Sequence, residues 1–160
     1  MRFGILLGVA CVACVTRAGT VEVSPQGLSP QGALEKIRAA RAKGDTSAWT
    51  VKVAPGEYRL EAEIANAKQV TYRGIDPDGD ATRVVINGQG KCRAFNLSEN
   101  SRIEGLTVSN CYNDVDNYGG GVRFWYLGTI TNCVIVGCTN AYAKASPDGK
   151  LSGGAGGGVC

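Results

Sequence analysis

The sequence contains no histidine among its 160 residues. That absence excludes Ser-His-Asp and Cys-His catalytic arrangements, and it excludes metal sites with imidazole ligands. The five cysteines that follow residue 18 include no Cys-x-x-Cys pair, so they do not form a thiolate metal motif of the usual spacing. The chemistry that stays open is that of carboxylates and basic side chains.

Long apolar runs are also scarce, and the main one lies at the N-terminus. Arg2 precedes an uncharged, mostly apolar run from Gly4 to Val15, and Ala18 provides a small residue for cleavage. The run is too short to span a membrane, so residues 1–18 are predicted to be a secretory signal peptide. No later stretch is apolar enough to cross a bilayer. The protein is therefore expected to be secreted or at the cell surface, without a membrane span.

A strong excess of charge of one sign is absent as well. The full chain has a formal charge of +3, and loss of Arg2 and Arg17 with the signal peptide lowers it to +1. Nucleic-acid-binding proteins carry a clear basic surface. No nucleic-acid partner is therefore expected.

What the sequence does contain is a repeat with a period of 27 residues, in which Arg102–Cys111 aligns with Thr129–Cys138. The apolar positions of the two stretches coincide: Ile103, Leu106, Val108 and Cys111 align with Ile130, Cys133, Ile135 and Cys138. A fixed period of this length indicates a solenoid, whose units bury their apolar faces by stacking on one another.

Two solenoids fit this spacing. A leucine-rich repeat places a further apolar residue after the shared pattern and returns through a helix. Here those positions are Asn113 and Asn140, and the return segment Asn117–Trp125 has glycines followed by β-branched and aromatic residues, which favour a turn and a strand. The expected fold is an all-β solenoid, a right-handed parallel β-helix, with the leucine-rich repeat as the alternative. Five segments are predicted to be parallel strands: Val51–Val53, Val70–Tyr72, Val84–Ile86, Leu106–Ser109 and Val134–Val136.

One helix is expected before the repeats. Ser29 can act as its N-cap, Pro30 fits its first position, and Gly44 follows its last turn. Leu34 and Ile37 fall on one face of this helix. Because an open solenoid end exposes apolar core and unpaired strand edges, the helix is predicted to be an N-terminal cap.

The chain therefore divides into the signal peptide, a strand with a capping helix at residues 19–48, and coils at residues 49–160. The Gly-Gly-Gly-Val sequence at Gly119–Val122 returns at Gly156–Val159, which is one period plus an insertion of ten residues. The sequence stops at Cys160, within a repeat. We therefore expect the coils to be truncated at the C-terminus and the chain to be the N-terminal fragment of a longer protein.

The helix and the strands that follow it carry a recognisable pattern, in Ala33–Arg38, Pro55–Leu60, Val70–Gly74 and Val84–Gly88. This pattern resembles the entry module of pectin-lyase-like right-handed β-helix proteins. The resemblance implies the fold more than a function, because the fold hosts lyases, hydrolases, adhesins and phage fibres. The Gly-rich repeats are in turn similar to those of polymorphic outer-membrane and other surface repeat proteins.

The candidate binding residues follow the first repeat. Alternation across residues 122–125 points Arg123 and Trp125 outward, next to a turn that contains Asp114 and Asp116. An exposed Trp beside an Arg and an acidic turn is what a groove for sugars or uronates would use. The alternative is a lateral stack that only shields the side of the solenoid.

The same turn, Asn113–Asn117, raises the question of a metal. Its acidic and amide oxygens are ligands that Ca²⁺ prefers, although an Asx-rich turn explains the composition equally. No cofactor is expected, with Ca²⁺ as the alternative. Cys111 and Cys138 are either small core residues or a disulfide between stacked strands, whose spacing of about 4.8 Å would permit the bond in a secreted protein.

Three functional classes remain open. The chain belongs to a structural or adhesive surface protein, to a polysaccharide lyase or glycoside hydrolase, or to a carbohydrate-binding module. A polysaccharide or cell-surface glycan is the expected partner. Lyases need a base and a carboxylate neutraliser, and hydrolases need a carboxylate pair. The sequence assembles neither set, so whether the chain is an enzyme stays open, and the Gly-rich repeats favour the first class.

Overall fold

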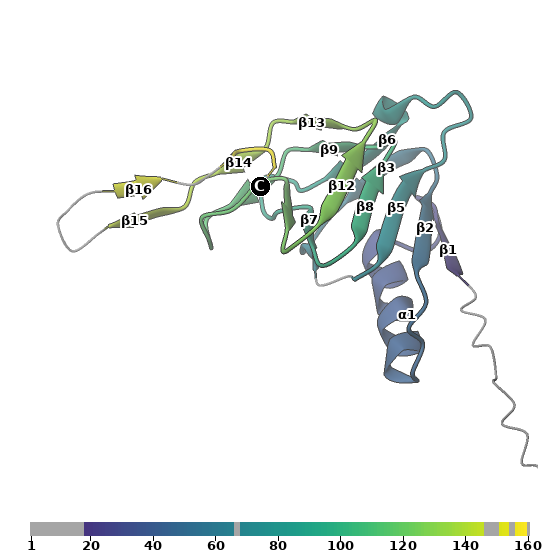
Figure 1. Ribbon diagram of the computed structural model, residues 1–160. Coiled ribbons are helices and arrows are strands. Elements are labelled where there is room, and N and C mark those ends of the chain that lie inside the picture. Colours follow the sequence, from purple (N-terminus) through teal and green to yellow (C-terminus); the bar gives the residue numbers. More distant parts are fainter. Residues whose placement is uncertain (1–17, 66–67, 146–150, 154–155, 160) are drawn as a thin grey trace, which may run out of the picture.

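The computed structural model describes residues 18–65, 68–145, 151–153 and 156–159. Most of its elements are strands in parallel sheets, with the single α-helix of the described residues at one end (Figure 1). The largest sheet has five parallel strands in the order β1 (Gly19–Val23), β2 (Trp49–Val53), β5 (Val70–Gly74), β8 (Ser101–Glu104) and β12 (Gly128–Thr131).

Three smaller parallel sheets complete the body of the molecule. The first has the order β13 (Val134–Val136), β9 (Thr107–Ser109), β6 (Val84–Asn87) and β3 (Gly56–Arg59). The second has the order β11 (Val122–Phe124), β7 (Phe95–Leu97) and β4 (Ile64–Ala65), and the third pairs β10 (Tyr112–Asn113) with β14 (Thr139–Asn140). A short 3₁₀ helix, η1 (Ala81–Arg83), precedes β6.

The strands repeat in the register that the sequence predicts. Ile103 pairs with Ile130, and Val108 pairs with Ile135 in the adjacent sheet. All five predicted strand segments lie in parallel strands, except that Leu106 precedes the start of β9. The return between the two repeats contains the strands β10 and β11.

The ten-residue insertion carries an antiparallel pair. β15 (Ala143–Ala145) pairs with β16 (Leu151–Gly153), and the two strands project away from the parallel sheets in Figure 1. Beyond them the backbone rejoins the body, where Val122 pairs with Val159 in a parallel bridge. Residues 1–17, most of the predicted signal peptide, and Cys160 lie outside the described residues. Within the described ranges, no helix has the length and apolarity that a membrane crossing requires.

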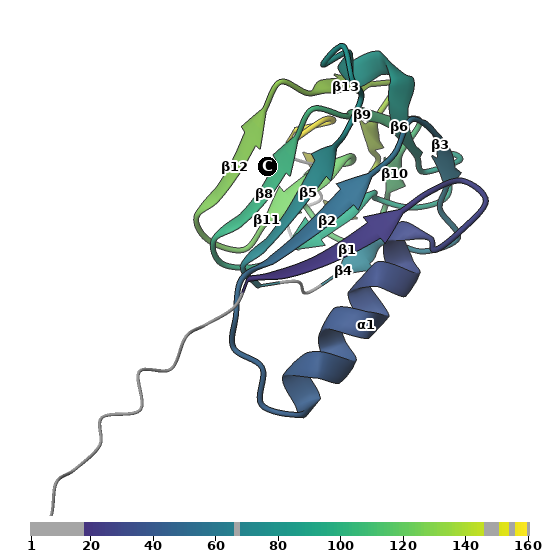
Figure 2. The same ribbon diagram turned by 90° about the vertical axis from the view of Figure 1, so that its right-hand side faces the viewer.

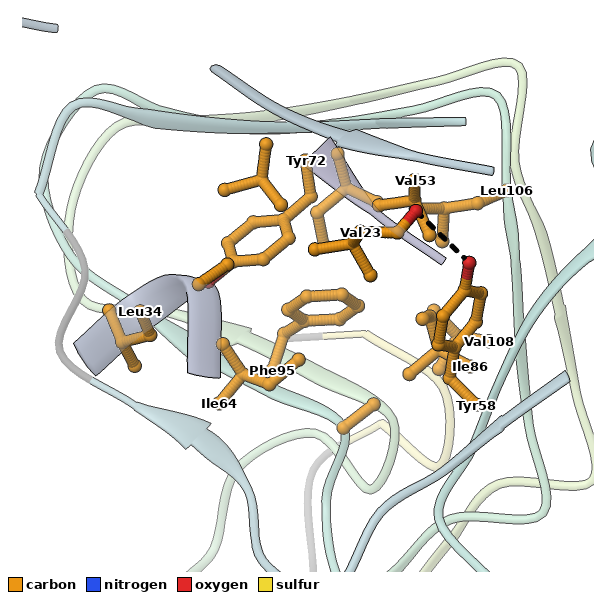
Figure 3. Close-up of a cluster of buried hydrophobic side chains, with 14 of the residues drawn as sticks. Val23, Leu34, Val53, Tyr58, Ile64, Tyr72, Ile86, Phe95, Leu106 and Val108 are labelled. Atoms are coloured by element: carbon orange, nitrogen blue, oxygen red, sulfur yellow. Dashed lines mark hydrogen bonds between the residues drawn. The ribbon is translucent and has the colours of Figure 1, made fainter. Parts of the chain in front are cut away.

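One apolar core lies between the sheets, as Figure 2 suggests from the way they surround a common interior. Alternate residues of the strands in the large parallel sheets point into it, because successive side chains of a strand face opposite sides. Tyr72 of β5 and Phe95 of β7 meet there with ring centroids 5.1 Å apart and a tilted geometry (Figure 3). The core therefore joins strands from different sheets into one packed unit.

The helix α1 (Pro30–Ala42) packs against β1, β2 and β4 at the end of this core (Figure 2). Ser29 is its N-cap, and the Ser29 Oγ accepts a hydrogen bond from the Gly32 N–H at 3.0 Å. Leu34 and Ile37 are buried, with 4% and 1% of their surface exposed. The predicted helix, its caps and its buried face are confirmed.

The core contains one polar atom whose removal should stabilise the protein. Tyr72 is fully buried, its hydroxyl makes no hydrogen bond, and burial raises its pKa above the usual range. A buried polar group without a partner costs about 1–3 kcal/mol. Tyr72→Phe should therefore raise the free energy of unfolding by about 1 kcal/mol, measured by urea denaturation.

Tyr58 provides the matched control for this substitution. Its hydroxyl donates to the Ala54 carbonyl at 2.8 Å and lies 3.3 Å from the Val23 carbonyl (Figure 3). Tyr58→Phe should lower the free energy of unfolding by about 1 kcal/mol, since it removes a satisfied hydrogen bond. A loss of stability of the same size in Tyr72→Phe would contradict the assignment of an unpartnered hydroxyl.

Candidate functional site

Three of the four predicted binding residues lie in one cluster. Arg123 is in β11, Trp125 follows that strand, and Asp116 is in the turn after β10. The Arg123 Nη1 lies 2.7 Å from the Asp116 Oδ2. The guanidinium carbon of Arg123 is 3.7 Å from the centroid of the Trp125 ring and 4.2 Å from that of Tyr118. The guanidinium therefore contacts two aromatic rings and one carboxylate at once.

The two outward-pointing residues differ in exposure. Trp125 is 50% exposed, whereas Arg123 is only 8% exposed. Arg123 does leave the outer side of its strand, but the turn that carries Asp116 and Tyr118 covers it. Its charge is therefore neutralised within the protein, and it is not open to a carboxylate of a ligand.

A second buried arginine holds the same turn, and sequence reasoning missed it. The side chain of Arg93 is 3% exposed, and it forms ion pairs with Asp116 and with Glu63, the latter at 3.4 Å. Its Nε donates to the Gly119 carbonyl at 2.7 Å, and its Nη2 donates to the Tyr118 carbonyl at 2.8 Å. The available signal was alternation, because Arg93 has the same parity as the buried Phe95 and Leu97 of β7, and a buried charge requires a partner.

Asn113 closes the turn from the other side. Its Nδ2 donates to the backbone carbonyls of Asp116 at 2.8 Å and of Tyr118 at 2.9 Å. It also donates to the Asp116 Oδ1 at 3.1 Å and lies 3.4 Å from the Oδ1 of Asn140, which is its partner in β14. This polar position of the repeat therefore fixes a turn, which explains why an apolar residue is absent there.

These contacts set the ionisation of Asp116. Burial alone would raise the pKa of this carboxyl, but hydrogen bonds from Arg93, the Tyr118 N–H and Asn113 together hold its pKa below the usual range. Asp116 is therefore an ionised counter-ion for two arginines.

The carboxylate of Asp116 is not available as a ligand for Ca²⁺. Both carboxylate oxygens of Asp116 are engaged by guanidinium groups, and the Asn113 amide nitrogen donates to the Oδ1 as well. A cation at these oxygens would be repelled by Arg93 and Arg123. In the part of the chain that the structure describes, no group of three or more Asp, Glu, Cys or His side chains is arranged to hold a metal ion.

Asp114 lies apart from the clamped carboxylate, at a pocket of about 330 Å³ beside it. The pocket is bounded by three segments, Glu61–Glu63, Lys91–Arg93 and Tyr112–Asp116. Its acids are mostly paired, because Glu61 lies 3.6 Å from Lys91 and Glu63 pairs with Arg93. Asp114 is exposed and has no partner among the described residues. The structure therefore gives the two predicted aspartates different roles: Asp116 is a half-buried counter-ion, and Asp114 is a free carboxylate.

Cys111 and Cys138 occupy equivalent positions of the two repeats, and both are free thiols in the structure. Cys111 is buried and Cys138 is half-buried. The neighbouring Cys138 thiol, together with burial, raises the pKa of Cys111, and the neighbouring Cys111 thiol lowers the pKa of Cys138. The two cysteines directly precede the paired residues Tyr112 and Thr139 of β10 and β14, and their disulfide stays a prediction.

Comparisons of this chain with protein-family models, with curated proteins and with solved structures found no match.

Proposed function

We propose that this chain forms a right-handed parallel β-helix in a secreted or surface-exposed protein with a structural and adhesive role. Parallel sheets with a repeated register support this fold, as does the helix packed at one end of the core. The return segment between the repeats contains strands, whereas a leucine-rich repeat would place a helix or 3₁₀ turn there. The resemblance of the entry segment to pectin-lyase-like proteins agrees with the same fold.

The single observation that carries the adhesive role is that the Trp125 ring is packed on Arg123 and is still exposed to solvent. One face of its ring rests on the Arg123 guanidinium, which Asp116 holds in place. Half of the Trp125 surface stays open to solvent, and the neighbouring Tyr126 is 70% exposed. An open aromatic ring that is held in place is suited to stacking on the apolar face of a sugar, since little side-chain entropy is lost on binding. The charge on Arg123 is already paired, so the expected contact at Trp125 is with the sugar face.

The adhesive role predicts that glycans change the fluorescence of Trp125. Trp49 is the other tryptophan, and its Nε1 donates to the Asp45 carboxylate at 3.1 Å, away from this cluster. Titration of the Trp49→Phe variant with neutral polysaccharides should quench or shift its remaining emission in a saturable manner. The Trp125→Phe variant should show no such response.

The two variants together control for nonspecific effects. Equal responses in both variants would show that the fluorescence change is a nonspecific effect of the added polysaccharide and does not come from the Trp125 ring. The absence of a response in Trp49→Phe to every neutral glycan would contradict the adhesive role of this ring.

A further inference from the structure

A second hollow lies on the outer side of the five-stranded sheet and is not part of the Trp125 cluster. We call it the Arg102 groove, and we define it by Ser47, Gln69, Thr71, Asn100 and Arg102. Its volume is about 420 Å³. A further hollow of about 190 Å³ continues it past Arg102 to Leu127 and Thr129. The groove therefore crosses several strands of the sheet, and polar side chains line most of its length.

The register of the sheet places hydroxyl groups on both sides of Arg102. Five residues share one row across adjacent strands: Thr20, Thr50, Thr71, Arg102 and Thr129. None of these five is buried, whereas Val51, Tyr72 and Ile103, the next residues of three of these strands, are in the core. Neighbouring strands lie about 4.8 Å apart, so the guanidinium has a threonine on each side within the reach of one sugar ring.

The charge on Arg102 is not neutralised within the protein. Among the described residues it has no hydrogen bond or ion pair, in contrast to Arg93 and Arg123. The acids nearby in sequence are occupied, because Glu104 lies 2.6 Å from Arg73 and Glu99 lies 3.6 Å from Lys68. The groove therefore presents an uncompensated guanidinium together with neutral donors and acceptors.

We propose that the Arg102 groove binds an anionic glycan, with the oxyanion held by the Arg102 guanidinium and the sugar hydroxyls held by Thr71, Thr129 and Asn100. A guanidinium presents paired donors that match the two oxygens of a carboxylate or sulfate. Hydroxyl and amide side chains both donate and accept, as sugar hydroxyls require. The shared chemistry of the ligand is an oxyanion beside hydroxyls, and uronates and sulfated sugars both provide it.

The Arg102 groove also extends towards Tyr126. A hollow of about 270 Å³ is bounded by Glu99, Asn100, Tyr126 and Leu127, and Tyr126 directly follows Trp125. A polymer in the Arg102 groove could therefore extend to Tyr126, the residue that follows Trp125. The inference shares the glycan class with the proposed function, but it rests on different residues and is tested separately.

The test is isothermal titration calorimetry of the full chain with three oligosaccharides of equal length: an oligogalacturonate, a sulfated oligosaccharide and neutral dextran. Arg102→Gln should weaken binding of at least one anionic probe about tenfold to a hundredfold, which matches the loss of a charged hydrogen-bonding pair. Any affinity for dextran should be unchanged. Arg102→Lys should recover only part of the loss, because lysine keeps the charge and lacks the paired donors.

Lys36→Gln is the matched control, since it removes one exposed positive charge on the outer side of α1. An equal loss in Lys36→Gln and Arg102→Gln would reduce the effect to net charge and overturn the proposal. Failure of the wild-type chain to bind either anionic probe would overturn it as well. Retained Arg102-dependent binding in Trp125→Phe would uphold this groove even if the proposed role of Trp125 failed.

Discussion

Replacing Leu34 with Asp should lower the free energy of unfolding by about 5 kcal/mol. Leu34 is 4% exposed and packs from α1 into the core. Removing a buried leucine side chain costs about 2–5 kcal/mol, and burying a carboxylate without a partner adds to that cost. Small domains have free energies of unfolding of about 5–15 kcal/mol. A loss of this size removes most of that stability, so the variant should be largely unfolded or aggregated.

Ala39→Asp on the exposed side of the same helix is the matched control. It introduces the same charge at a solvent-facing position, so its expected cost is below about 1 kcal/mol, set by helix propensity. Leu34→Ala should fall between the two. These differences are measured by urea denaturation followed by circular dichroism. Equal stabilities for the two Asp variants would show that α1 does not cover the core.

Replacing Asp116 with Asn should lower the free energy of unfolding by about 3–5 kcal/mol. The substitution leaves two guanidinium groups, those of Arg93 and Arg123, without their shared counter-ion in a buried site. Breaking a buried ion pair from one side costs this much because the remaining charge is uncompensated. Asp114→Asn is the matched control, and its effect should stay within about 0.5 kcal/mol because Asp114 is exposed and unpaired.

The role of Asp116 can also be tested by measuring how the free energy of unfolding depends on pH. The pKa of Asp116 is lower in the folded protein than its usual value. Its contribution is therefore fully present above the unfolded-state pKa of about 3.9, and it is lost as the pH falls through the lower folded-state pKa. The stability difference between the wild type and Asp116→Asn should be constant near neutral pH and should shrink in acid. A difference that does not change in acid would contradict the role of Asp116 as an ionised counter-ion.

Local patterns predicted the parts of the fold that depend on nearby residues. The caps of α1 follow from Ser29, Pro30 and Gly44, because capping is decided within one turn of the chain. The register of the paired strands follows from the repeat, since a shift by one residue would turn Ile103 and Val108 out of the core.

The candidate site depends on contacts that are distant in sequence, and this limited its prediction. Trp125 could be placed on the outer side by alternation alone. The burial of Arg123 could not be predicted by alternation, because it depends on the turn at Asp116 folding over β11. Arg93 lies 23 residues before Asp116, and their pairing becomes visible only when neighbouring strands are stacked.

The exposed groove was missed for a related reason. Thr71, Arg102 and Thr129 belong to three different strands, and their spacing along the chain is not uniform. Only the observed register places them in one row. A single unpaired arginine in a polar row carries no local sequence signal, whereas a tryptophan beside an arginine does.

The most direct test of the adhesive role is the affinity of the folded full chain for immobilised polysaccharides, measured by surface plasmon resonance. We expect saturable binding of neutral polysaccharides by the wild type, which is lost in Trp125→Ala and kept in Trp49→Phe. Binding of neutral polysaccharides that is unchanged in Trp125→Ala, or no binding to any neutral polysaccharide, would contradict the adhesive role of Trp125.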